Sequence, residues 1–427
     1  MIELKYGKQT LKLSTDCLPL EPRLLSGEDA PAVADGAAAV GRALENPIGS
    51  PRLGELVSAS DRVVVIVPDL TRAARCDVVL PVLLEELRAA GVSDRAVTIL
   101  FALGMHSPNS QAEKQQIVGM GVARRVRMVD HDARDPRQNV VVGKTSFGNE
   151  IAINRLAVES DKVIVTGTIG FHLFAGFGGG RKGILPGVAG AECTLCNHML
   201  TLTTLGSRWN DAARAGNLEG NPVHLDMAEA ADMVKPTFLV NTLVNCEKQI
   251  VDVVAGDVHK AFAEGCRLYD GYYRLKTDGK ADFVIASCGG YPKDINFIQT
   301  HKTIEYAMNV LREGGVMLVL GACSRGLGNK DFLDWFQYGT EEEFAEGLKA
   351  TYLKGNRNAQ TAYRLFWKTR RATIVLFTQL PDSTVQRMGM VPVDKIEDAV
   401  TIAREKLGDG FSTHLIPSGA HFLVEAE

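Results

Sequence analysis

The sequence lacks any long apolar run. Its β-branched runs, such as "VVVIV" at 63–67 and "VMLVL" at 316–320, are far shorter than the roughly 20 residues that a transmembrane helix needs. The N-terminal "MIELKYGKQTLKL" alternates apolar and polar residues instead of forming the apolar core of a signal peptide, and it predicts a pair of strands with a turn at Gly7. We therefore expect a cytoplasmic protein.

A basic excess and a disulfide framework are also absent. The formal net charge is -4, and no basic face dominates the chain, which argues against nucleic acid as a partner. The eight cysteines are scattered, as expected for small buried side chains. Only Cys193 and Cys196, in "CTLCNH", are close, but Asn197 separates Cys196 from His198 and no second ligand pair follows. We expect both cysteines to be helix residues and His198 to remain available as a single metal ligand.

What the chain does contain is strands alternating with helices. Its 427 residues exceed one hydrophobic core and suggest two domains. Strand-like runs lie at 62–72, 96–106, 162–172, 237–245, 283–292, 315–326 and 372–380, and helical segments at 76–91 and 296–315 lie among them. This pattern predicts an α/β protein of two domains with largely parallel sheets and an active-site cleft between them. The apolar rhythm breaks at 269–282, so we expect an N-terminal domain at 1–272 and a C-terminal domain at 273–427.

Unusual residues follow several of the expected strands. They are Asp69 and Arg72, His106, His172, Gly289–Pro292 and Gly321–Gly328. Ligands of open α/β sheets bind outside the carboxyl ends of the strands, so these segments are expected to converge on one cleft.

"PDLTR" at 68–72 places Asp69 where it could cap a helix, with Thr71 and Arg72 in the first turn. A plain cap explains the motif, but an arginine is unfavourable at this end of a helix dipole and could serve an anion. His106 and His172 could each be a structural histidine. Because both histidines follow expected strands, a role in acid–base catalysis becomes a stronger interpretation than a structural role. For His131 and Asp132 a loop or capping role is expected.

The segment "GFGGGRKG" at 176–183 resembles a phosphate-binding loop but fails its template, because Gly183 follows Lys182 where a serine or threonine is required. Glycines such as Gly178 and Gly179 allow a ligand to approach the backbone closely, although a tight loop would also explain them. A lysine among glycines and apolar residues can have a lowered pKa and act as a nucleophile. Lys182 is thus a candidate for phosphate binding or for covalent attachment, and the residues alone leave both open.

"GGYPKDINFIQTHK" at 289–302 predicts a glycine turn and a helix that Asp294 caps. Gln299 and Lys302 are three residues apart and share a helix face, which is either a ligand-binding face or a solvated one.

Taken together, these segments resemble the nickel-dependent lactate racemase family over essentially the whole chain. The resemblance rests on "DLTR" at 69–72, His106, "FHLFAGFGGGRKGILPGVAGAECTLCNH" at 171–198, "GNPVHLDM" at 220–227 and "GGYPKDINFIQTHK" at 289–302. It implies nickel in a pincer nucleotide, which cofactor-maturation enzymes supply, and a protein that could form a homo-oligomer.

The resemblance also assigns roles to residues. It implies that Lys182 holds the cofactor covalently, that His198 completes the nickel coordination, and that His106 and His172 are the two acid/base groups. It further implies cofactor binding by Asp69, Thr71, Arg72, Gly178 and Gly179, and substrate binding by Arg72, Gln299 and Lys302.

The implied activity is that of an isomerase, a racemase or epimerase of a 2-hydroxy carboxylic acid that works by reversible hydride transfer. The alternatives are an oxidoreductase that binds NAD(P) or a phosphate ligand non-covalently through the glycine loop, and a protein that only binds a small anion. Two departures concern the substrate. Ile298 stands where lactate enzymes of the family carry tyrosine, and Arg357 could line the side-chain pocket and favour a larger or anionic acid such as malate. A solvated surface arginine explains Arg357 equally well.

Overall fold

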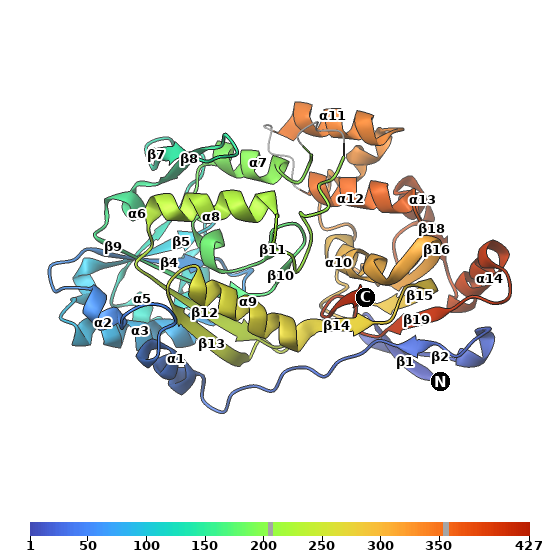
Figure 1. Cartoon of the computed structure of the whole chain (residues 1–427), viewed down its shortest axis with the longest axis horizontal. Helices are drawn as coiled ribbons and strands as arrows, with labels where there is room; N and C mark the ends of the chain where they lie inside the picture. Colours follow the sequence, from blue (N-terminus) through green and yellow to red (C-terminus); the bar gives the residue numbers. More distant parts are fainter. Residues whose placement is uncertain (204–207, 353–357) are drawn as a thin grey trace. The chain divides into compact units, whose positions relative to one another are not determined.

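A computed structural model describes residues 1–203, 208–352 and 358–427 (Figure 1). The chain divides into two compact units, each with its own sheet. The larger unit contains Asp29–Thr201 and Asn210–Tyr272, and the smaller unit contains Met1–Glu28, Leu202–Trp209 and Tyr273–Glu427. Within the described residues, no helix combines the length and the apolar character that crossing a bilayer requires.

The larger unit is built on a six-stranded sheet in the order β13-β12-β9-β4-β5-β6. Its strands are β4 (Val63–Pro68), β5 (Val97–Ala102), β6 (Arg127–Asp130), β9 (Lys162–Ile169), β12 (Phe238–Val244) and β13 (Ile250–Gly256). All neighbours are parallel except β12 and β13. The hairpins are β7 (Asn139–Lys144) with β8 (Glu150–Asn154), and β10 (Phe171–His172) with β11 (Gly176–Phe177).

Nine helices of the larger unit follow the expected alternation with strands. They are α1 (Gly36–Glu45), α2 (Leu53–Leu56), α3 (Cys76–Ala89), α4 (Gln111–Val118), α5 (Met120–Ala123), α6 (Arg155–Glu159), α7 (Ala191–Met199), α8 (Pro222–Val234) and α9 (Lys260–Tyr273, in which Tyr273 is the first residue of the smaller unit). The strands are buried on both faces, as their β-branched runs predict. Val63 and Val65 of β4 share a core with Leu80 and Leu83 of α3. Ile66 points to the opposite face, where the glycine loop packs.

The smaller unit has an all-parallel six-stranded sheet in the order β18-β17-β16-β15-β19-β3. Its strands are β3 (Arg23–Leu24), β15 (Ala281–Ser287), β16 (Leu311–Leu320), β17 (Thr373–Phe377), β18 (Val391–Val393) and β19 (Thr413–Ile416), and β14 (Arg274–Thr277) pairs separately with β20 (Leu423–Ala426). Its helices are α10 (Phe297–Ala307), α11 (Glu341–Tyr352), α12 (Ala359–Thr369), α13 (Asp382–Arg387) and α14 (Ile396–Leu407).

These sheets confirm the α/β class with largely parallel strands. The N-terminal hairpin is also confirmed, since β1 (Ile2–Tyr6) pairs with β2 (Gln9–Leu13) across Gly7. One helix is shorter than expected: α10 ends at Ala307, and β16 already begins at Leu311.

The expected assignment of 1–272 to one domain differs from the observed division in two segments, Met1–Glu28 and Leu202–Trp209. Residues 1–28 belong to the smaller unit, whereas the change at 272/273 coincides with the expected boundary. The physical reason is packing: Leu4, Leu13 and Leu18 lie in one core with Phe283, and β3 adds to the edge of the same sheet. Contacts between residues so far apart in the sequence leave no local pattern from which they could be predicted.

Candidate active site

His106 and Asp69 form a hydrogen-bonded pair in the larger unit. Asp69 directly follows β4, and His106 lies in the turn after the neighbouring strand β5. The distance between His106 Nδ1 and Asp69 Oδ2 is 2.5 Å. Asp69 is 7% exposed, whereas the His106 side chain is 46% exposed, so the carboxylate supports a ring that a small molecule can reach.

The pair fixes the proton on one ring nitrogen. Burial raises the pKa of Asp69, but the hydrogen bonds from His106 and Thr71 and the charge of Arg72 outweigh burial, so this pKa lies below its ordinary value. An ionised carboxylate can only accept, so His106 Nδ1–H donates, and any lone pair of this ring lies on Nε2. A general base needs such an orientation, so the geometry is compatible with the predicted acid–base role of His106, which stays a prediction.

The expectation that Asp69 caps a helix is wrong. The next helix, α3, begins only at Cys76, with Arg75 at its N-cap position. Asp69 Oδ1 instead accepts the Thr71 N–H at 2.9 Å and the Thr71 hydroxyl at 2.5 Å, which closes a side-chain turn. Arg72 therefore does not lie in a first helical turn, and the argument from the helix dipole does not apply to it.

His172 and His198 flank the ring of Phe174. The centroid of Phe174 lies 4.6 Å from that of His172 and 5.1 Å from that of His198, and both contacts are edge-to-face. His172 Nδ1 accepts the Ala175 N–H at 3.2 Å, which leaves the proton of the neutral ring on Nε2. Burial and the charges of Lys182 and Arg72 lower the pKa of His172 far below its ordinary value, so the ring is neutral.

His198 lies at the end of α7. Burial, and then the charge of Lys182, lowers its pKa to about 3. Across residues 1–203, 208–352 and 358–427, neither of its ring nitrogens makes a hydrogen bond. Its neighbour Asn197 holds the helix in place, because Asn197 Nδ2 donates to Asp226 Oδ2 of α8 at 2.9 Å. His198 is thus a neutral imidazole on an anchored helix, the form in which histidine binds metals.

Lys182 lies in a 3-10 turn at Gly180–Gly183, packed on the face of β9 and β4. Burial, followed by the charges of Arg181 and Arg72, lowers its pKa far below the ordinary lysine value. A lowered pKa makes the neutral, nucleophilic amine easier to form, which favours covalent attachment over phosphate binding. The charge of Lys182 in turn affects both His172 and His198, so these three side chains lie in one neighbourhood.

The glycines of the loop are needed for packing of the protein against itself. A Cβ on Gly179, whose φ is +78°, would meet Asn241 Oδ1 at 2.6 Å, and one on Gly180 would meet the Phe262 ring at 2.5 Å. The Gly178 N–H donates to Gly170 O at 2.7 Å. The Gly180 N–H donates to Asn241 Oδ1 at 2.8 Å. These two N–H groups are therefore already used within the protein, which disfavours a phosphate cradle here.

Gln299 and Lys302 both lie on α10 of the smaller unit. Gln299 is half-buried and Lys302 exposed, while most of the helix around them is buried. The helix N-cap is Asn296, whose side chain accepts the Gln299 N–H, so the expected cap at Asp294 is wrong. Asp294 Oδ2 instead accepts the Gly7 N–H at 2.6 Å and the Ala322 N–H at 3.1 Å. Arg357 lies outside the described residues, and Ile298 is half-buried.

Other candidates have structural roles. Both ring nitrogens of the buried His131 are used, Nε2 by Ala189 O at 2.9 Å and Nδ1 by Asn154 Nδ2 at 3.0 Å. Cys193 and Cys196 are helix residues of α7, as expected. None of the eight cysteines forms a disulfide, but the expectation that they are buried is wrong for Cys196 and Cys246, which are exposed.

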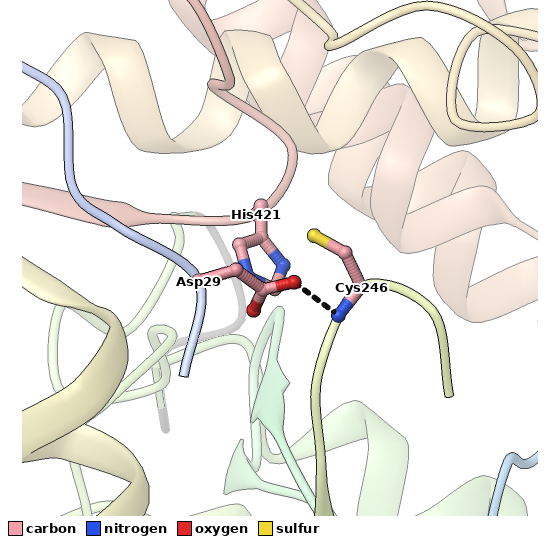
Figure 2. A group of neighbouring side chains, drawn as sticks. All are labelled: Asp29, Cys246 and His421. Atoms are coloured by element: carbon pink, nitrogen blue, oxygen red, sulfur yellow. Dashed lines mark hydrogen bonds between the residues drawn. The ribbon is translucent and has the colours of Figure 1, made fainter. Parts of the chain in front are cut away.

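A polar contact at the start of the larger unit is drawn in Figure 2. The Cys246 N–H donates to Asp29 Oδ2 at 2.9 Å. His421, which the figure also labels, belongs to the smaller unit.

The sequence reasoning did not single out Arg181 or Phe174. Arg181 is the largest fully buried side chain, and Phe174 contacts two of the candidate histidines. The only signal in the sequence was that both residues lie between His172 and His198. A charged residue in a glycine loop normally suggests ligand contact, and its burial among backbone carbonyls is not visible in the sequence.

The larger unit of this α/β protein thus holds a histidine supported by a carboxylate and, around the glycine loop, a second group of two neutral histidines and a buried lysine. Two family models match the chain: the lactate racemase N-terminal domain at residues 6–210 and the lactate racemase C-terminal domain at 276–424. The protein is therefore an isomerase of the racemase type, and it belongs to the lactate racemase family.

Individual relatives agree with this assignment. Lactate racemase of Thermoanaerobacterium thermosaccharolyticum is 33% identical over 90% of this chain and 89% of its own. Lactate racemase of Lactiplantibacillus plantarum is 29% identical over 90% of both chains. The structure of the T. thermosaccharolyticum lactate racemase apoprotein superposes with a TM-score of 0.87, at 30% identity, and covers 99% of each chain.

Proposed function

We propose that this protein racemises or epimerises a 2-hydroxy carboxylic acid with a nickel-pincer nucleotide attached to Lys182. The observation that carries the proposal is the grouping of Lys182, His172 and His198 around one loop of the larger unit. The larger unit also contains the His106–Asp69 pair. This supplies an attachment point, a metal ligand and two imidazoles, which are the parts that such a reaction needs.

The residues fit the proposed cofactor. The ring nitrogens of His198 are not used in hydrogen bonds within the described parts of the chain, and imidazole is a suitable ligand for nickel. Lys182 would hold the nucleotide through Nζ, and its lowered pKa favours bond formation, because the reactive neutral amine forms more readily. When bound, the cofactor would supply the reversible hydride chemistry by which a stereocentre becomes planar.

The protein supplies the proton transfers. His106 Nε2 would accept the hydroxyl proton of the substrate while Asp69 stabilises the resulting imidazolium. His172 would accept the hydroxyl proton of the opposite enantiomer at Nε2, which requires its ring proton to lie on Nδ1 and the Ala175 N–H to be released from Nδ1 during turnover. Two differently placed imidazoles are what inversion at one carbon requires.

Substrate recognition is proposed for cationic and amide groups. Arg72 would pair with the carboxylate, because a guanidinium offers two parallel hydrogen bonds to it, and Gln299 and Lys302 would add contacts from α10. Both curated relatives are named lactate racemases, which favours lactate as a substrate. The prediction that Arg357 would favour a larger or anionic acid such as malate stays a prediction, because Arg357 lies outside the described residues.

The test is to mature the protein together with the cofactor-synthesis enzymes and assay enantiopure 2-hydroxy acids. Interconversion of enantiomers without added NAD(P) supports the proposal. Turnover that requires NAD(P), in a protein whose intact mass equals that of the bare chain, would replace it with the oxidoreductase alternative. Protein from a host without those enzymes is expected to fold normally but to be inactive.

A further inference from the structure

The loop between His172 and Lys182 is folded around the side chain of Arg181. Its guanidinium donates to three carbonyls of the loop: to Ala175 O at 2.7 Å, to Phe177 O at 3.0 Å and to Gly179 O at 3.4 Å. Arg181 is only 1% exposed. Five guanidinium donors in a fixed fork can organise several acceptors at once, which a lysine cannot do.

A fourth donor of Arg181 reaches α8. Arg181 Nε donates to His224 Nδ1 at 2.9 Å, and the guanidinium lies 4.2 Å from the centroid of the Phe262 ring. Burial and the charge of Arg181 lower the pKa of His224 to about 3, so its Nδ1 is a permanent acceptor. Burial lowers the pKa of Arg181 itself only to about 10, so the guanidinium stays charged at neutral pH.

Other carbonyls of the loop are held from outside. Phe174 O accepts Asn221 Nδ2 at 2.9 Å, and Gly176 O accepts the Gly216 N–H at 2.9 Å. Five carbonyls between Phe174 and Gly179 therefore have fixed directions, and Arg181 orients three of them. His172 precedes this stretch and Lys182 follows it, and the proposed function places both residues at the reacting centre.

We propose that Arg181, supported by His224, is a positioning residue that sets the backbone between His172 and Lys182. It touches neither substrate nor cofactor and acts through the loop carbonyls. The inference rests on the proposed function for its catalytic meaning. A role in bulk stability alone would predict that any equally destabilising change has the same effect on turnover.

The experiment compares four variants with the wild-type protein. Arg181→Met removes the guanidinium. His224→Leu removes its acceptor on α8 and carries the test if Arg181→Met fails to fold. His224→Asn keeps an acceptor oxygen near the place of Nδ1 and is the conservative variant. Leu83→Ala is the control, because it opens the core on the other face of the sheet at the expense of stability alone.

Two readouts are measured on each variant. The first is hydrogen exchange of loop amides in the protein without cofactor, such as those of Ala175, Gly178 and Gly180, which are hydrogen-bonded in the structure. The second is kcat and KM for each nickel bound in matured protein. We expect faster exchange in Arg181→Met and His224→Leu, and a kcat lowered on the order of 10²-fold with much less change in KM, because small misplacements of reacting groups have effects of this size. In His224→Asn, loop exchange and kcat are expected to stay close to the wild-type values. In Leu83→Ala, both are expected to be unchanged.

The inference is overturned if loop exchange in Arg181→Met equals that in Leu83→Ala, or if kcat for each nickel is unchanged. The exchange measurement does not require the cofactor. Failure of the proposed function, seen as no adduct in matured wild-type protein, is therefore distinguishable from failure of this inference.

Discussion

At the scale of single residues, the two candidate acid–base histidines are supported differently. His106 donates to the Asp69 carboxylate and keeps its lone pair on Nε2. His172 accepts a backbone N–H at Nδ1 and carries its proton on Nε2. Asp69 therefore matters for the protonation state of one histidine only, and a change at Asp69 tests this difference.

Asp69→Asn is expected to lower kcat by about 10²–10⁴-fold, because an amide that donates to Nδ1 would move the ring proton to Nε2 and remove the base. Steady-state kinetics in both directions measure the effect. Thr71→Val is the matched control: it deletes one hydrogen bond to Asp69 and keeps the carboxylate, so a much smaller loss is expected. Equal losses in the two variants would contradict the assignment.

The pH dependence of this pair follows from the lowered pKa of Asp69. A carboxyl group with a folded-state pKa below its unfolded value stabilises the fold above the unfolded value of about 3.9, and this contribution is lost as the pH falls through the folded-state pKa. Wild-type unfolding free energy should therefore decline in this acidic range by more than that of Asp69→Asn. Parallel pH profiles from chemical denaturation would count against an ionised Asp69.

At the scale of elements, α10 and α12 of the smaller unit are joined by buried charges. Glu305 of α10 pairs with Arg364 and Lys368 of α12, and all three side chains are largely or fully buried. Although burial raises the pKa of Glu305, the charges of Arg364 and Lys368 lower it well below its ordinary value, so the carboxylate is ionised. This connection holds the helix that carries Gln299 and Lys302.

Glu305→Gln is expected to destabilise the smaller unit by about 3–5 kcal/mol, because it leaves two cations buried without a counter-charge. Chemical denaturation followed by tryptophan fluorescence reports on this unit, since Trp209, Trp335 and Trp367 all belong to it. Glu346→Gln, which breaks the exposed pair with Lys349 on α11, is the control and should have no measurable effect. A loss below about 1 kcal/mol in Glu305→Gln, the size of an exposed pair, would contradict the buried-pair account.

The elements also show what the sequence could and could not predict. The central strands of both sheets were predictable because their β-branched runs are buried on both faces. Strands β6, β13, β18 and β19 were not predicted. The caps at Asp69 and Asp294 were predicted wrongly because both carboxylates accept hydrogen bonds elsewhere, from His106 and Thr71 or from Gly7 and Ala322. The role proposed for Arg181 could not be derived locally, since its partner His224 is 43 residues away.

At the scale of the whole molecule, the first 28 residues belong to the smaller unit although the larger unit follows them in the chain. They contribute a strand to its sheet and apolar side chains to its core, including Leu4, Leu13 and Leu18. Deleting residues 1–28 should therefore destabilise the smaller unit selectively.

The measurement for this deletion is hydrogen exchange resolved by peptide. Peptides from β15 and β16 should exchange faster, whereas those from β4 and β9 should keep wild-type rates. Faster exchange in β4 and β9 alone would show that the N-terminal segment supports the other unit. Equal loss throughout would contradict the division into two units.

The central claim is that Lys182 carries a nickel cofactor. The most direct measurement is the intact mass of matured protein, followed by peptide mapping and nickel analysis, with Lys182→Ala prepared in parallel. The account predicts a heavy adduct on the peptide that contains Lys182, stoichiometric nickel, and loss of the adduct, the nickel and the racemisation in a Lys182→Ala protein that remains folded. An active wild-type protein with the mass of its bare chain, or an adduct that persists in Lys182→Ala, would contradict it.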